Sequence, residues 1–412
     1  MKKKQWTYTD LFIATSLVGF FTAIILWISG AVGFEQSVLS KEHIFADFFC
    51  HLGFAAQGKE LYLNSKSACF PPLAYCFYYI ILKINPILGT DNIDTQAVMG
   101  YGNNLLILVI YSMMVGVLLV ECVHSFLGKE RSLRNTVLGI LIICSYPFMA
   151  TSIQRGNIIA PVAVMICYSF HWMDSENKLK KELSILFLAI AICFKIYPAI
   201  LGVGYLFDKR YKELLKLVIY TTVLFFVPFM FFGGMNGLRA FTENVLMLAS
   251  DAEDRWCTVR GFVALVIDGK VSQSHKILIS GGCEIVFLIV ALWCSWISDI
   301  RWKRAFFLGM ILVSFVPSNY VYTLVYLMPP LLLLLKEKAG AYISSANEVV
   351  AILVFGIVFS MPVWMIPVFR DGIAEGMFKI LFLFFAVMAI DTILKWMSAH
   401  NLCPMTRRVR VE

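Results

Sequence analysis

Three charged side chains in this largely apolar chain are candidates for chemistry: Asp47, Arg155 and Lys195. A carboxylate just outside the hydrocarbon of a membrane can take a proton from a hydroxyl group delivered to the membrane surface, which is general-base catalysis. Two cations can hold a phosphate group through charged hydrogen bonds. One acid and two cations on one side of a membrane therefore indicate chemistry on a lipid-borne substrate.

Several polar residues accompany these three in the sequence. His51 follows Asp47 by four positions, so on a helix the two side chains share one face. Arg155 lies in a tight Gln-Arg-Gly-Asn turn, in which Gly156 lets the backbone reverse. The substrate-binding candidates are His51, Tyr62, Gln154, Asn157, Tyr197, Asn319, Tyr320 and Tyr322.

Each candidate also has a simpler interpretation. An acid in an outer loop is commonly only solvated, and Arg155 could bind lipid headgroups. Tyr320 and Tyr322 are typical of the aromatic belt at a membrane interface. Lys195 could contact carbonyl groups at a helix end. However, a cation at membrane depth costs about 2.5–3.5 kcal/mol on insertion scales, which favours a functional site.

The composition predicts an all-α polytopic membrane protein. Hydrophobic residues make up 59% of 412 and charged residues 15%, against about a quarter charged in soluble domains. Long apolar runs recur along the chain, and we expect about 12 transmembrane helices in a single integral-membrane domain, residues 1–412. The clearest spans lie near 11–32, 101–125, 136–153, 158–172, 214–233, 277–298, 305–317, 320–335, 347–368 and 377–397.

The basic residues orient these spans. Lys and Arg gather in short clusters between apolar runs, as the positive-inside rule describes, so the net charge of +8 does not indicate nucleic acid. We expect a multi-pass protein of the cell membrane with both termini in the cytoplasm and with the loops 33–71 and 234–276 outside. The cytoplasmic clusters would be 2–4, 129–134, 178–181, 209–212, 301–304, 336–338 and 407–410.

Two apolar segments do not fit as single spans. The stretch 72–85 is too short to cross about 30 Å of hydrocarbon, so we expect a helix at the outer interface. The stretch 183–207 has basic clusters at both ends and carries Lys195 and Pro198 at its centre. A re-entrant hairpin of two short helices, with its apex at Lys195, satisfies both observations.

Four motifs in order resemble glycosyltransferase family 87, integral-membrane enzymes of the GT-C superfamily. The resemblance covers about residues 10–335. The motifs are Asp47 with Gly58, Leu61, Tyr62 and the helix opening at Pro71-Pro72-Leu73, then the turn Arg155-Gly156-Asn157, then Lys195 with Pro198 and the basic loop after Asp208, and finally Ser318-Asn319-Tyr320.

The resemblance implies an inverting transferase that uses a polyprenyl-phosphate sugar, most commonly mannose, as donor. Asp47 would deprotonate an acceptor hydroxyl of a lipid-linked or cell-envelope glycan on the outer face, and Arg155 and Lys195 would hold the donor phosphate. The lipid tail would lie in a groove between helices, and membrane lipids would be further partners of the protein. Because only one acid is well placed, we expect no divalent metal and no cofactor.

Other interpretations remain open from the sequence. A transporter or flippase of lipid-linked sugars would use the same cationic cavity without a base, although such proteins often contain internal repeats and none is visible here. An inactive scaffold of an envelope-assembly complex is a third possibility. Cys50 and Cys69 share the first outer loop and could either pair or remain free thiols.

Overall fold

The computed structural model describes residues 6–30, 45–84, 101–128, 132–250, 257–315, 321–360 and 373–400. Within these ranges the chain forms helices and no β-strand, which confirms an all-α membrane protein. Five helical segments are long and apolar enough to cross a membrane. They belong to α1 (Tyr8–Ile28), α6 (Tyr101–Leu127), α11 (Tyr211–Phe226) with η7 (Val227–Phe231), α14 (Gln273–Ile297) and α18 (Ile373–Ala399).

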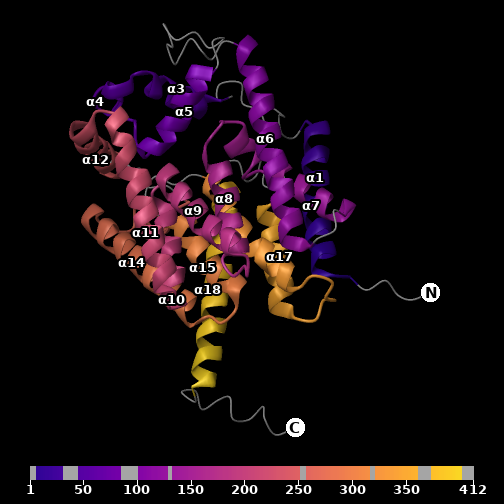
Figure 1. The fold of residues 1–412 in the computed structure, drawn as a ribbon. Coiled ribbons are helices and arrows are strands. Elements are labelled where there is room, and N and C mark those ends of the chain that lie inside the picture. The colour runs from indigo at the N-terminus through magenta and orange to yellow at the C-terminus, as the bar shows by residue number, and fades with distance from the viewer. Residues whose placement is uncertain are drawn as a thin grey trace, which may run out of the picture.

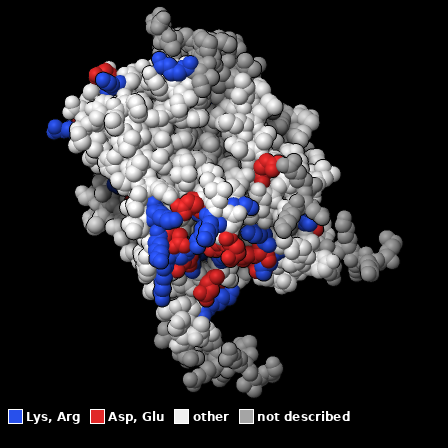
Figure 2. Space-filling model, in the orientation of Figure 1, with Lys and Arg blue, Asp and Glu red and all other residues white. Residues whose placement is uncertain are grey.

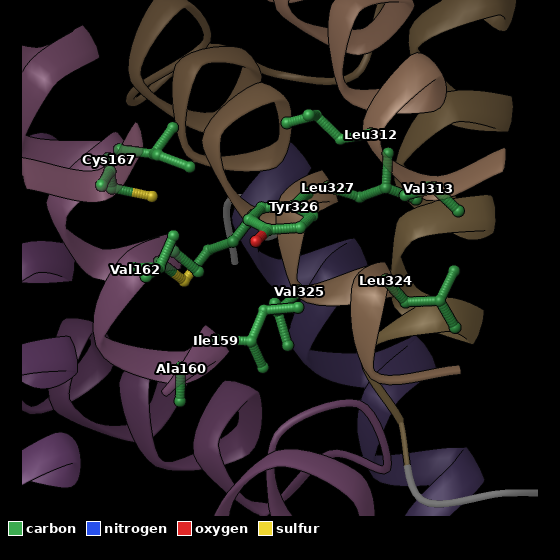
Figure 3. Close-up of a cluster of buried hydrophobic side chains, with 14 of the residues drawn as sticks. Ile159, Ala160, Val162, Cys167, Leu312, Val313, Leu324, Val325, Tyr326 and Leu327 are labelled. Atoms are coloured by element: carbon green, nitrogen blue, oxygen red, sulfur yellow. The ribbon is translucent and has the colours of Figure 1, made fainter. Parts of the chain in front are cut away.

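Shorter helices fill the space between the long ones (Figure 1). They are α7 (Leu133–Cys144), α8 (Ile159–Trp172), α9 (Lys178–Phe194), α15 (Arg301–Ser314), α16 (Met328–Glu337) and α17 (Ala346–Val358). Side chains of α8, α15 and the 3₁₀ segment η8 (Val321–Leu327) form a core of buried hydrophobic residues around Tyr326 (Figure 3). Because α15 and α16 are apolar on nearly every face, they are buried in the centre of the protein.

Two expected spans are interrupted. The span expected at 136–153 is wrong as a single helix, because α7 ends at Cys144 and a π-helical turn, η5 (Met149–Ile153), follows Pro147. Proline has no N–H to continue a helix, which accounts for the break. The span expected at 320–335 is likewise divided into η8 and α16, with Pro329 and Pro330 at the start of α16.

The two expected outer loops contain helices, and the first loop packs against the first helix of the second loop at one end of the molecule (Figure 1). The first holds α3 (Ala46–Ala56), η2 (Gly58–Glu60) and α4 (Leu61–Asn64), and α5 (Pro72–Ile84) follows it. The second holds α12 (Gly234–Ser250) and α13 (Val259–Val266). The buried Asn244 of α12 donates hydrogen bonds to the carbonyls of Tyr62, Ser65 and Ala68, so α12 fixes the path of the first loop.

Charged side chains concentrate at the opposite end (Figure 2). There a cavity of about 700 Å³ is lined by residues of three expected cytoplasmic clusters. Ion pairs join these clusters: Arg210 to Asp174 at 2.7 Å, Lys181 to Glu213 at 3.0 Å, and Arg304 to Asp208. The clusters 178–181, 209–212 and 301–304 therefore share one face of the protein.

The segment 183–207 is broken at Lys195. Helix α9 ends at Phe194, Lys195 has an extended backbone, and η6 (Tyr197–Gly202) and α10 (Val203–Phe207) follow. The hydroxyl groups of Ser184, near the start of α9, and Tyr205, in α10, are 3.5 Å apart. The two ends of the segment thus lie close together, beside the charged cavity, while Lys195 lies at the far end of α9.

Candidate active site

The carboxylate of Asp47 lies at the first turn of α3 and is bound on both oxygens. Its Oδ1 accepts hydrogen bonds from Arg155 Nε at 3.0 Å and from Arg155 Nη2 at 2.5 Å. Its Oδ2 accepts from Asn157 Nδ2 at 2.7 Å. Burial raises the pKa of Asp47. The hydrogen bonds and charge of Arg155 and the hydrogen bond from Asn157 lower this pKa by more than burial raises it, so the pKa lies below the usual value of a carboxyl group. Asp47 is therefore ionised at neutral pH.

The Gln-Arg-Gly-Asn turn positions the start of α3 as well as its own side chains. The carbonyl of Gln154 accepts from the Phe45 N–H at 2.7 Å, and the carbonyl of Arg155 accepts from the N–H groups of Asp47 and Phe48 at 3.1 and 3.2 Å. These carbonyls satisfy N–H groups that a helix start leaves without partners. No side chain caps α3, so this turn takes that role.

Gly156 allows the Gln-Arg-Gly-Asn turn to lie close to the start of α3. Its φ is +62°, in the left-handed region that favours glycine, and an added Cβ would lie 2.6 Å from Phe48 Cβ. Phe45 also has a left-handed backbone, with a φ of 56°. Strained backbone of this kind persists only where the surrounding contacts hold it, and it is concentrated at functional sites.

Asn157 is anchored on both sides of its amide. Its side chain is buried, and its Oδ1 accepts from the Ile159 N–H at 3.0 Å while its Nδ2 binds Asp47. Its backbone carbonyl accepts from the hydroxyl of Tyr111 on α6 at 2.7 Å. Asn157 thus holds Asp47 Oδ2 in a rigid setting.

His51 lies one turn after Asp47 in an aromatic setting. Its ring stacks on Phe70 with centroids 3.8 Å apart, and its Nδ1 is 3.1 Å from the hydroxyl of Tyr75. Burial, aided by the charge of Lys195 and opposed by that of Asp47, lowers the pKa of His51 to about 3. His51 is therefore neutral near pH 7 and lies within electrostatic reach of both Asp47 and Lys195.

Lys195 is a buried cation surrounded by aromatic rings. Its side chain is 5% exposed, and its Nζ lies 4.6 Å from the ring centroid of Phe70, 5.2 Å from that of Tyr322 and 5.8 Å from that of Tyr197. Within the part of the chain that the structure describes, no acidic group or carbonyl binds this ammonium. Cation–π contacts offset part of its desolvation but do not neutralise its charge.

The structure thus brings together most of the site residues expected from the sequence. Arg155 and Asn157 both bind Asp47. His51 and Lys195 both contact the ring of Phe70, and Tyr197 and Tyr322 lie beside the Lys195 ammonium. Tyr62 donates its hydroxyl to the Phe70 carbonyl at 2.8 Å, so it supports the loop that carries this ring. Gln154 contributes its carbonyl to the start of α3. Asn319 and Tyr320 lie outside the described residues.

Sequence reasoning missed Phe70, Tyr75, Tyr111 and Asn244. Phe70 directly precedes the Pro71-Pro72 pair, and that position was the one available signal, because 34 phenylalanines offer no other distinction. Tyr111 lies inside an apolar helix, where its hydroxyl is a polar group that requires a partner. Among the described residues, no group of three or more His, Cys, Asp or Glu side chains could hold a metal ion. Cys50 and Cys69 are free thiols.

Comparisons with known proteins identify the chain through its family. Neither the curated proteins nor the solved structures contain a match to it. The family model of glycosyltransferase family 87 matches residues 86–319, which is more than half of the chain and includes Arg155, Asn157 and Lys195. Asp47 precedes the matched region, but it is bonded to two residues within it. The protein is a membrane glycosyltransferase and belongs to glycosyltransferase family 87.

Proposed function

We propose that the protein is an inverting hexosyltransferase that moves a sugar, most simply mannose, from a polyprenyl-phosphate donor to a hydroxyl of a lipid-linked or cell-envelope glycan. The observation that carries this proposal is the buried ammonium of Lys195. It has aromatic rings around it and no anion among the described residues. A buried unpaired cation is costly, and an anionic group of the substrate would neutralise it.

In the proposed reaction Asp47 is the general base. The acceptor hydroxyl gives its proton to Asp47 while its oxygen attacks C1 of the donor sugar. The bond from C1 to the phosphate oxygen breaks, and polyprenyl phosphate leaves with the bonding electrons, so the configuration at C1 inverts. Lys195 and Arg155 would stabilise the negative charge that develops on the leaving phosphate.

We further propose a GT-C-like arrangement of about 12 transmembrane helices, with the Asp47 site at the outer face and both termini in the cytoplasm. Support comes from the meeting of the clusters 178–181, 209–212 and 301–304 at the end opposite α3. The closeness of Ser184 and Tyr205 supports a re-entrant hairpin for 183–207. Helix α5 would lie at the outer interface, packed against α3.

Transfer by purified protein tests the enzymatic proposal. Wild-type protein in lipid nanodiscs, given labelled polyprenyl-phosphate mannose and membrane glycolipid, should form a labelled glycolipid. Asp47→Asn should lower the transfer rate by about 10²–10⁴-fold, the usual contribution of a general base. Near-normal transfer by the folded variant would remove Asp47 from the mechanism. Movement of intact donor across a bilayer by that variant would instead favour a transporter.

Topology is tested separately by labelling single cysteines from each side of the membrane. Cysteines placed at 176–180 and at 209–213 should label from the same, cytoplasmic side, whereas cysteines in α3 should label from outside. Labelling of the first two positions from opposite sides would contradict the re-entrant hairpin.

A further inference from the structure

The two oxygens of Asp47 are held in unequal ways. Oδ2 is bound by Asn157, a buried side chain that is itself fixed through Ile159 and Tyr111. Oδ1 is bound by the guanidinium of Arg155, whose side chain is 34% exposed. One partner is therefore part of the rigid core, and the other belongs to a long side chain that can adopt other rotamers.

This inequality matters because the resting carboxylate is a poor base. With Arg155 on Oδ1 and Asn157 on Oδ2, both oxygens carry hydrogen bonds that favour the ionised form. An acceptor hydroxyl approaching Asp47 would have to compete with the guanidinium for Oδ1. A proton acceptor works best when one oxygen is accessible and the group as a whole stays in place.

We propose that the donor phosphate releases the base: on binding it takes Arg155 from Asp47, which frees Oδ1 for the acceptor hydroxyl while Asn157 keeps the carboxylate in position. This inference rests on the proposed function and adds to it the order of events. Donor binding precedes formation of a competent base, so the enzyme does not activate an acceptor before a donor is present.

The charges of the site favour such an exchange. The ammonium of Lys195 has no anionic partner among the described residues, so a phosphate is attracted to the site before it contacts Arg155. A guanidinium binds phosphate as readily as carboxylate, through two parallel N–H bonds. Movement of Arg155 would leave the backbone intact, because its carbonyl and not its side chain supports the N–H groups of Asp47 and Phe48.

The exchange makes an unusual prediction about the variant that lacks the base. In Asp47→Asn the carboxylate no longer competes for Arg155, so the inactive protein should bind a lipid phosphate more tightly than the wild type. The competing ion pair is partly exposed, so we expect an increase of about three- to tenfold in affinity. The probe is a polyprenyl monophosphate without sugar, titrated against full-length protein in nanodiscs, and the corresponding polyprenol serves as the uncharged control.

A double-mutant cycle separates exchange from simple charge repulsion. In an Arg155→Gln background, Asp47→Asn should give no increase in affinity, because no guanidinium remains to be released. An equal increase in both backgrounds would show that Asp47 only repels the phosphate at a distance, and would overturn the exchange. Unchanged or weaker binding by Asp47→Asn would overturn it as well. If Asp47→Asn does not fold, Asp47→Ser is measured in the same cycle.

Lys195→Met distinguishes failure of this inference from failure of the proposed function. Loss of phosphate-dependent binding in Lys195→Met, without an increase in Asp47→Asn, would leave the proposed phosphate site standing and refute the exchange. Binding that is equally strong in wild type and in Lys195→Met, or equal for the phosphate and the polyprenol, would refute both.

Discussion

Replacement of Lys195 by methionine tests the proposed phosphate site most directly, because methionine keeps the length and apolar stem of the side chain and removes its charge. A charge-assisted hydrogen bond contributes about 1.5–3 kcal/mol. Since 1.4 kcal/mol is a factor of ten, donor affinity should fall by roughly tenfold to a hundredfold. The measurement is a titration of polyprenyl-phosphate sugar against purified protein.

The stability of this variant should stay close to that of the wild type. Loss of the ammonium removes a desolvation cost of about 2.5–3.5 kcal/mol. It also removes cation–π contacts with three rings, each contributing about 0.5–2 kcal/mol. These two contributions are similar in size and opposite in sign, so the apparent melting temperature should change little. A structural lysine would give the reverse result, with stability lost and donor affinity retained.

Lys303 provides a matched control for Lys195. It is equally buried, but its Nζ is paired with Asp391 at 2.6 Å. Removing one partner of a buried ion pair is destabilising, although Lys395 and Asn347 still bind Asp391 here. Lys303→Met should therefore lower stability and leave donor affinity unchanged. Unchanged donor affinity in Lys195→Met, together with a fall in stability like that of Lys303→Met, would refute the assignment of Lys195 to the phosphate.

Three further variants, one of them a control, test the setting of Asp47. Gly156→Ala should lower the transfer rate by about 10²-fold, because the added Cβ would displace Phe48 and the start of α3. The control is Gly58→Ala, at a φ of +55° with open space around it, which should cost only about 1 kcal/mol of stability and little activity. Equal losses of activity in both variants would contradict the steric argument. The pKa of His51 is lowered from 6.5 to about 3, so its contribution to stability is complete above pH 6.5 and is lost as the pH falls toward 3. Between pH 6 and 4.5 the wild type should lose up to about 1.4 kcal/mol per pH unit more than His51→Gln, measured as melting temperature against pH. Parallel curves would mean that the pKa of His51 is the same in the folded and the unfolded protein.

The sequence was sufficient to predict that Asp47 and the turn at Arg155 meet, because the basic clusters predict the same side of the membrane for both. It was not sufficient to predict their partners. Arg155 was expected to face a phosphate and Asn157 a substrate, yet both bind Asp47. The positive-inside rule gives the side of the membrane on which a residue lies, but the direction of a side chain depends on packing between distant segments.

The interior of the fold shows the same limit. Apolar runs predicted the long helices well, because length and hydropathy alone decide them. The break after Cys144 could have been predicted from Pro147, and the start of α16 from the Pro329-Pro330 pair in its first turn. The position of Phe70 before the Pro71-Pro72 pair marked the residue but did not indicate its contacts. Phe70 touches both His51 and Lys195, which are remote from each other in sequence.

The hydrogen bonds from Asn244 to the first expected outer loop have a consequence for biosynthesis. The carbonyls that Asn244 binds belong to Tyr62, Ser65 and Ala68, which are synthesised some 180 residues earlier. Asp47 is likewise synthesised more than 100 residues before its partner Arg155. During translation the loop therefore emerges on its own, and its backbone groups and carboxylate depend on water until later hairpins have been inserted. A nascent chain released before Gly234 would carry every charged group proposed for catalysis and lack the helix that shapes the loop around them.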